Sequence, residues 1–318
     1  MEIAVIKGKK REKNYIAHAA SDVRRKKGSA QKKEFYQYLT LVLPAFVIFT
    51  IGLIIPIFLA FRYSLTSWNG LTKEKTFVGL ENYIKMLSDP YVRSAWWFTI
   101  RFTFWNVLIQ NFFALLFAVI LDSGVRGKKI YRTILFIPCL ISPLVTGFIW
   151  LRMYSNILPA VLEFFGMSGS FIKLFGDQKT VLSGLLIANN WQWIGYWMLI
   201  YLAGLQSVPA DLYEAAKIDG ANWIQRFRNV TIPMLAPSFT ICIVGITTGS
   251  LKVYDLMVSS TQGGPGRAST SIIYLIYDSA INGRQYGYGS ALSISLIFAL
   301  LIVAVIQVAV LKKREVQA

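Results

Sequence analysis

Polar and aromatic side chains gather within one apolar segment, Val181–Leu205. Asn189, Gln192, Trp193 and Tyr196 recur there at helical spacing, so a helix over this segment would place them on one face. Amides pair with hydroxyl groups, which both donate and accept hydrogen bonds, and a flat ring covers the apolar face of a sugar ring. The face is a candidate contact for a polyhydroxylated solute, although such side chains also bridge or pack against neighbouring membrane helices.

The sequence lacks the groups that catalysis or metal binding would need. Its one histidine, His18, lies in a basic segment, and its two cysteines, Cys139 and Cys242, lie inside apolar runs. Two such cysteines make neither a disulfide framework nor a zinc site, and one histidine supplies no acid–base pair. We therefore expect no enzyme activity, no metal and no cofactor in this chain.

Other polar residues of the apolar segments have two interpretations each. Asn106 and Gln110, four residues apart, would line a pathway or, as is more usual in membranes, hydrogen-bond between helices. Trp150 is a candidate for the solute pathway, with an interfacial aromatic belt as the alternative. Lys252 and Asp255, three residues apart, predict a local ion pair, whereas an anionic sugar would instead meet the lysine.

The composition indicates a membrane protein. Of the 318 residues, 55% are hydrophobic and 15% are charged, with a mean hydropathy of +0.49, against about 45–50% and about 25% in soluble domains. A helix crosses the hydrocarbon core with roughly 20 apolar residues, and no alternating barrel pattern is present. The sequence predicts an all-α, six-helix transmembrane domain over 38–312. Its spans run over about 39–63, 96–121, 130–154, 181–205, 236–257 and 290–311.

The net charge of +17 is mainly a signal of topology. Lys and Arg are concentrated in the segment 1–37, in the connections 122–129 and 206–235, and after Leu311. Basic residues favour the cytoplasmic side of a membrane. We therefore expect the chain to lie in the inner or plasma membrane of the cell, with both termini in the cytoplasm and a basic cytoplasmic tail over 1–37. We expect no nucleic-acid partner.

The cytoplasmic connection 206–235 is more than a linker. Pro209 suits a helix start, and Glu214 with small alanines behind it suits a short helix that Gly220 then ends. Trp223 and Phe227 give a second short helix an apolar stripe. The two helices predict either a surface for another protein or a helix that lies on lipid.

The residues of this connection resemble the EAA loop of binding-protein-dependent ABC importer permeases. Glu214, Ala215, Ala216 and Gly220 match its pattern, and Asp219 matches the form usual in carbohydrate importers. Thr261-Gln262-Gly263-Gly264-Pro265 resembles an element of the maltose-type permease half. Ile232-Pro233 departs slightly from the last part of the EAA pattern, where one residue commonly separates the two.

The resemblance implies a type I importer permease fold and a division of labour among subunits. The expected partners are a second homologous permease, two ATPase subunits, an extracytoplasmic solute-binding protein and membrane lipid, with a carbohydrate as the solute. Glu214, Ala215, Ala216, Asp219 and Gly220 would form the coupling helix that docks on the ATPase. The chain has no phosphate-binding loop, so ATP and Mg²⁺ would be bound by the ATPase partner.

Three alternatives remain at this point. A related importer would carry a non-sugar solute such as glycerol phosphate or an amino acid. A secondary transporter would need acids deep in its spans for ion coupling, and the sequence places none there. A membrane enzyme would need the acid–base groups that the chain lacks.

Overall fold

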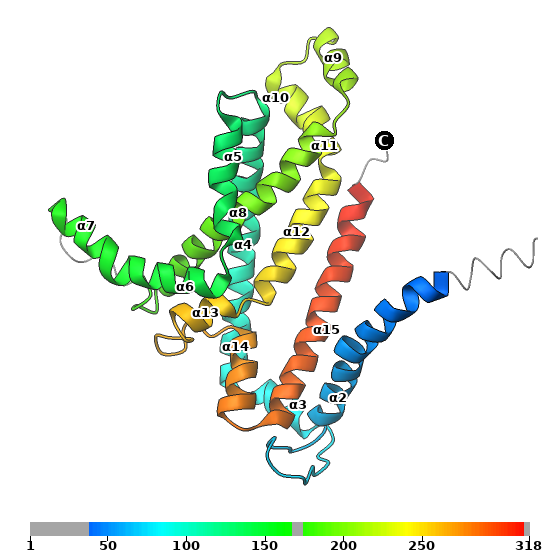
Figure 1. Ribbon diagram of the computed structural model, residues 1–318, viewed down its shortest axis with the longest axis vertical. Coiled ribbons are helices and arrows are strands. Elements are labelled where there is room, and N and C mark those ends of the chain that lie inside the picture. Colours follow the sequence, from blue (N-terminus) through cyan, green and yellow to red (C-terminus); the bar gives the residue numbers. More distant parts are fainter. Residues whose placement is uncertain (1–37, 167–173, 315–318) are drawn as a thin grey trace, which may run out of the picture. The chain divides into compact units, whose positions relative to one another are not determined.

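The computed structural model describes residues 38–166 and 174–314, and this part of the chain is helical (Figure 1). Its β structure is limited to an isolated antiparallel bridge between Thr66 and Phe77. The all-α prediction is confirmed. The chain divides into two units, Met1–Leu59 and Ala60–Ala318. The basic tail expected over 1–37 lies outside the described residues.

Apolar helices account for most of the described chain. The first runs over Tyr38–Ser64 and ends in α2, Ile55–Ser64. The helices that follow are α3 Glu81–Ser88, α4 Pro90–Asp122, α5 Lys128–Phe136, α6 Pro143–Arg152, α7 Leu158–Phe164, α8 Val181–Gln206, α9 Ala210–Ile218, α10 Trp223–Arg226, α11 Ile232–Met234, α12 Ala236–Leu251, α13 Asp255–Ser260, α14 Ile272–Tyr277 and α15 Tyr286–Leu311.

Proline positions explain three of the four π-helical turns in the described residues. A proline lacks the N–H for the usual bond, and its ring clashes with the carbonyl four residues earlier. The residue just before the proline bonds five residues back instead, which widens the turn. The turns and their prolines are Thr50–Ile54 with Pro56, Met153–Ile157 with Pro159, and Phe227–Thr231 with Pro233.

The core of the second unit lies where α4, α8 and α12 pack together. Ala114 and Ala118 of α4 are fully buried, and their small side chains let the backbones of α4 and α8 approach closely. Tyr201 of α8 fills the space beside them. The Tyr201 hydroxyl donates to Asn111 Oδ1 at 2.5 Å. Figure 1 shows α15 running beside α12, in agreement with the contacts between them.

The predicted third span over 130–154 is wrong as a single helix. The chain leaves helical geometry at Ile141 and Ser142, which are extended with ψ of 136° and 137°. Pro143 is the cause, because a proline pushes the residue before it out of the helical region. The helix α5 therefore ends before this break, and the apolar helix that follows it runs over Pro143–Phe164.

The predicted fifth span over 236–257 also ends early, because α12 stops at Leu251 and a turn separates it from α13. At its other end, the chain bends by 65° between Trp223–Met234 and Ala236–Leu251. Among the described residues, four helices are long and apolar enough to cross a membrane, or five if this bent pair counts as one span. The amide-rich α8 is outside that set, so the count of six stays a prediction.

Candidate functional site

A cavity of about 440 Å³ lies among α4, α8, α12 and the start of α13. We call it the amide cavity, because Gln110 and Asn189 face it from α4 and α8. Trp193, Tyr196 and Trp197 add aromatic walls from α8. Its α12 side carries Gly245, Gly249 and Ser250, so that wall presents backbone and a small hydroxyl. The cavity thus combines flat rings with amide groups.

Buried amides connect this cavity to the interior of the α4–α8 pair. Gln110 Nε2 donates to Asn189 Oδ1 at 3.0 Å and to Asn106 Oδ1 at 3.3 Å. Asn190 Nδ2 donates to the same Asn106 oxygen at 3.1 Å and to the Leu186 carbonyl at 2.6 Å. The exposed fractions of Asn106, Gln110 and Asn190 are 0%, 2% and 6%. We call Asn106, Gln110, Asn189 and Asn190 the amide chain.

The amide chain fixes which atom Asn189 offers to the cavity. Its oxygen already accepts from Gln110, and its Nδ2 has no protein partner among the described residues. An amide nitrogen carries two donors. Asn189 therefore presents a hydrogen-bond donor, which suits a hydroxyl, ether or carboxylate oxygen of a solute.

The structure separates the five predicted pathway residues. Asn189, Trp193 and Tyr196 line the amide cavity together. Gln192 is fully buried and does not line it; its Nε2 donates to the Ile141 carbonyl at 2.7 Å, at the break before α6. Trp150 also lies away from it and packs on rings of α8 and the turn after α6, within 5.8 Å of Trp191 and 5.1 Å of Tyr154.

Two expectations about the flanking polar residues have opposite outcomes. The interhelical hydrogen bonds expected for Asn106 and Gln110 are confirmed. The ion pair expected between Lys252 and Asp255 is wrong, because α12 ends at Leu251 and the two residues do not share a helix. Both are exposed and line the amide cavity, and the structure has one ion pair within the described residues, Arg267–Asp278 at 3.5 Å.

The connection between α8 and α12 forms the two short helices that the sequence indicates. The helix α9 ends in a Schellman motif: the Ala221 N–H bonds the Ala216 carbonyl at 2.9 Å, and the Gly220 N–H bonds the Lys217 carbonyl at 3.0 Å. This geometry requires Gly220 to have φ +77°, which glycine adopts without a Cβ penalty. The turn after α9 is therefore set by the backbone.

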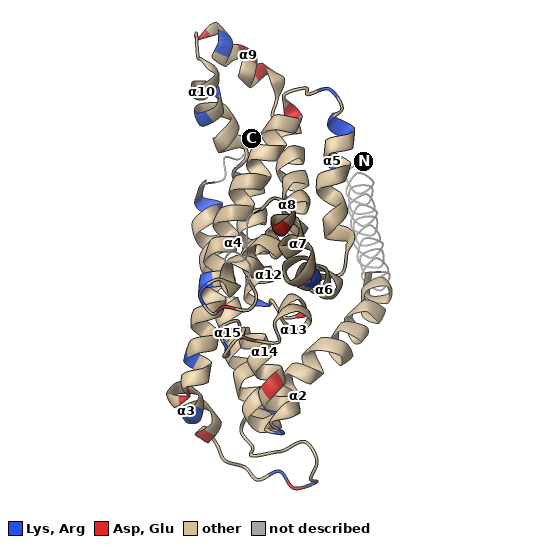
Figure 2. Cartoon of the chain, turned by 90° about the vertical axis from the view of Figure 1, so that its left-hand side faces the viewer, with Lys and Arg blue, Asp and Glu red and all other residues tan. Residues whose placement is uncertain are grey.

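The surface of this connection is open to contact. Glu214, Ala215, Asp219 and Gly220 are exposed and Ala216 is half-buried. Ile218 is 86% exposed, and Trp223 is 61% exposed although its ring stacks on Phe227 at 5.5 Å between centroids. Figure 2 shows acidic and basic residues along α9.

Side-chain bonds hold the two short helices in place. Asn222 and Gln225 make a reciprocal capping box at the start of α10, with bonds of 2.8 and 2.9 Å. The Tyr213 hydroxyl lies 3.0 Å from Thr231 Oγ1, which ties α9 to the turn before α11. The five predicted coupling residues thus lie together on α9 and the turn that ends it.

Backbone geometry also shapes the segment Thr261–Pro265. Gln262 and Gly263 both have positive φ, 48° and 79°. Thr261 Oγ1 lies 2.7 Å from Ser269 Oγ, and that serine hydroxyl donates to the Gly264 carbonyl at 2.5 Å. Ser269 is fully buried. The segment is a turn closed by its own hydroxyl groups.

The fold and site together describe a helical membrane protein with a polar cavity among its packed helices and an exposed helical connection between α8 and α12. Residues 110–316 match the model of the family described as the binding-protein-dependent transport system inner membrane component. The chain belongs to this family, and it is a permease subunit of an ABC importer.

Three relatives show the range of solutes in the family. The chain is 32% identical over 294 residues, covering 91% of it and 99% of the relative, to the probable starch degradation products transport system permease AmyD of Thermoanaerobacterium thermosulfurigenes. It is 34% identical over 257 residues (80% and 86%) to the trehalose/maltose transport system permease MalF of Thermococcus litoralis. It is also 34% identical over 272 residues (84% and 91%) to the sn-glycerol-3-phosphate transport system permease UgpA of Salmonella typhimurium.

A solved structure supports the fold. A bacterial ABC transporter that imports the acidic polysaccharide alginate contains a chain that superposes with a TM-score of 0.76 at 19% identity. The match covers 89% of the present chain and 96% of that chain. The type of fold expected from the EAA-like residues is therefore confirmed.

Proposed function

We propose that this chain forms half of the pathway of an ATP-driven carbohydrate importer. The observation that carries the proposal is the amide cavity, where Asn189 offers a donor beside the rings of Trp193 and Tyr196. Hydroxyl oxygens accept from such a donor, and sugar rings stack on such walls. The names of the starch-product and trehalose/maltose relatives agree with this solute class.

We further propose that the connection after α8 couples the chain to an ATPase. Glu214, Ala215 and Ala216 lie on α9, Asp219 and Gly220 lie on the turn that ends it, and the large apolar side chain of Ile218 beside them is 86% exposed. A rigid turn of this kind transmits a displacement to the helices on either side of it, α8 and α12. In this proposal ATP and Mg²⁺ bind to two ATPase subunits, a second permease completes the pathway, and a solute-binding protein delivers the sugar from outside. Both termini and the coupling turn lie on the cytoplasmic side of the inner or plasma membrane, as the distribution of Lys and Arg supports.

A phosphorylated solute is the second candidate. Lys252 is exposed at the amide cavity and has no carboxylate partner among the described residues, so its ammonium group is available to an anion. The glycerol-3-phosphate relative supports this alternative. The nearby Asp255 opposes it, because its carboxylate lines the same cavity and repels a phosphate.

Uptake by the complete transporter in vesicles tests the solute class. The assay compares radiolabelled maltotriose, an alginate trisaccharide and sn-glycerol 3-phosphate, with ATP and with no ion gradient. We expect ATP-dependent uptake of a neutral or acidic sugar. Uptake of glycerol phosphate alone would overturn the carbohydrate proposal, and uptake driven by an ion gradient without ATP would overturn the importer mechanism.

A further inference from the structure

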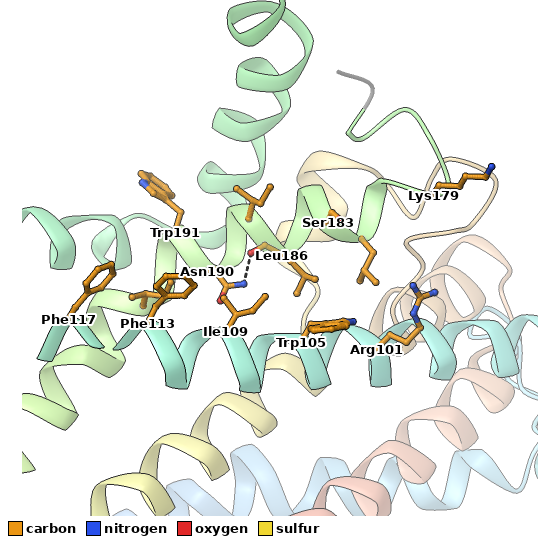
Figure 3. Close-up of a pocket in the computed structure, with 13 residues that line it drawn as sticks. Arg101, Trp105, Ile109, Phe113, Phe117, Lys179, Ser183, Leu186, Asn190 and Trp191 are labelled. Atoms are coloured by element: carbon orange, nitrogen blue, oxygen red, sulfur yellow. Dashed lines mark hydrogen bonds between the residues drawn. The ribbon is translucent and has the colours of Figure 1, made fainter. Parts of the chain in front are cut away.

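A second cavity, of about 680 Å³, lies along α4 and α8 and shares no lining residue with the amide cavity (Figure 3). We call it the α4–α8 groove. Its α4 side is a row of residues spaced four apart, which places them on one helix face. The row consists of Arg101, Trp105, Ile109, Phe113 and Phe117. At 1.5 Å per residue it extends about 24 Å, longer than the roughly 15 Å that one leaflet contributes to the hydrocarbon core.

The walls of the groove are apolar and aromatic over most of its length. Trp105, Phe113 and Trp191 provide rings, and aliphatic side chains of α8 complete the lining. The one amide, Asn190, already directs its Nδ2 to the Leu186 carbonyl and to the amide chain. The walls therefore offer little to a sugar and much to a hydrocarbon chain.

Positive charge is confined to one end. Figure 3 shows Arg101 of α4 and Lys179 just before α8 at the end away from Phe117. Both cations are exposed, and neither makes an ion pair within the described part of the chain. The nearby Asp177 uses one carboxylate oxygen to accept from the Lys179 backbone N–H at 2.8 Å. The groove thus has an apolar body and a cationic end.

We propose that the α4–α8 groove binds an anionic phospholipid, with an acyl chain along the Trp105–Phe117 row and the phosphate at Arg101 and Lys179. The shape and charge fit one molecule with both features, because basic side chains pair with a phosphate and an apolar row covers a hydrocarbon chain. A zwitterionic lipid fits less well, because its own ammonium group competes for the same phosphate. An apolar helix of a partner subunit would cover the walls but would leave the two cations without a counter-charge.

Brominated acyl chains quench tryptophan fluorescence on contact, and Trp105 and Trp191 report on the groove through the difference between the parent chain, which has nine tryptophans, and its Trp→Phe variants. The complete transporter, with its partner subunits, is placed in phosphatidylcholine vesicles that contain a small fraction of either brominated phosphatidylglycerol or brominated phosphatidylcholine. We expect phosphatidylglycerol to quench at concentrations on the order of tenfold lower. The Trp105→Phe and Trp191→Phe variants should each lose part of this selective quenching.

Charge variants identify the head-group site. The double variant Arg101→Gln with Lys179→Gln should abolish the preference for phosphatidylglycerol, whereas Arg101→Lys should retain most of it. Arg152→Gln on α6 is the matched control and should leave the lipid preference unchanged. If the double variant fails to assemble, the quenching measured with Arg101→Lys, Trp105→Phe and Trp191→Phe still tests the proposal. Equal quenching by the two lipids overturns the proposal. So does the absence of lipid quenching at Trp105 and Trp191, which would mean that a partner subunit covers the groove.

Discussion

The amide chain between α4 and α8 and the turn after α9 are held by opposite means. Three members of the amide chain are buried and Asn189 is half-buried, and each member depends on side-chain hydrogen bonds to the others. The turn after α9 is exposed and depends on backbone bonds to Lys217 and Ala216. The interior should therefore respond to the loss of a single polar atom, and the turn should respond to a change of backbone conformation.

The turn provides the largest expected effect. Gly220→Leu places a side chain at φ +77°, which costs roughly 1–2 kcal/mol, while no other atom of the described residues lies within 4 Å of the new Cβ. The chain should fold but lose the α9 geometry, so ATP-driven uptake should fall to background while the ATPase subunits still co-purify. Transport and co-purification are measured on the same preparation.

Gly124 provides a matched control for this variant. It has φ +87° and also has no atom within 4 Å of an added Cβ, but it lies in the connection between α4 and α5. Gly124→Leu should therefore reduce stability to a similar extent and leave uptake nearly intact. Normal uptake by Gly220→Leu, or equal loss in both variants, would contradict our assignment of coupling to the turn after α9.

The amide chain provides the next effect. Asn106→Ala removes an oxygen that accepts from both Gln110 and Asn190, so each of these amide nitrogens loses one hydrogen bond and keeps one, to Asn189 Oδ1 and to the Leu186 carbonyl respectively. A buried N–H that loses its acceptor costs about 1–3 kcal/mol, although hydrogen bonds inside membranes average about 0.6 kcal/mol. We expect a clear drop in the thermal midpoint of the purified complex. Asn229→Ala, at an exposed position, should leave the midpoint unchanged; equal midpoints in the two variants would show that the amide chain contributes nothing.

The sequence correctly predicted those residues of the candidate site whose positions depend only on helix periodicity. Asn189, Trp193 and Tyr196 share the amide cavity because four- and seven-residue spacings return to one helix face. Gln192 lies beside that face of α8, and its side chain points to the carbonyl of Ile141. This carbonyl is free to accept because the chain leaves helical geometry just before Pro143. If 130–154 formed one continuous helix, as the sequence predicted, this carbonyl would be used within the helix, so the contact with Gln192 could not be predicted.

The ends of helices explain the other errors. The spacing of Lys252 and Asp255 makes an ion pair only on a continuous helix, and α12 ends one residue earlier. The turn at Gly220 was predictable because a single glycine after a short helix is a local signal. The turn that a single glycine signals was therefore predicted correctly, whereas the ion pair that depends on the exact end of α12 was not.

Gln110→Met tests whether the amide chain also positions the solute contact. The substitution keeps the volume and removes the donor to Asn189 Oδ1, so the Asn189 amide is free to rotate. Loss of about 1 kcal/mol in solute binding would raise the apparent KM about fivefold with the maximal rate unchanged. The measurement is the concentration dependence of uptake for the sugar that the vesicle assay identifies. Gln192→Met is the control, since Gln192 is buried but does not line the amide cavity: it should lower stability and leave KM unchanged.

The smallest effect is expected at the rim of the amide cavity. Lys252→Gln removes an exposed charge that has no carboxylate partner in the part of the chain that the structure describes, so stability should change by less than about 0.5 kcal/mol. Uptake of a neutral sugar should be unchanged, because its hydroxyls meet Asn189 and the rings rather than the ammonium group. Uptake of an anionic solute should fall several-fold in Lys252→Gln and rise in Asp255→Asn, because the two side chains exert opposite fields on the same cavity. A several-fold loss of neutral-sugar uptake in Lys252→Gln would show that the sugar contacts the rim of the amide cavity rather than the amides of α4 and α8. The contrast between the hydrogen-bonded amide chain and the exposed turn after α9 would then no longer describe this permease.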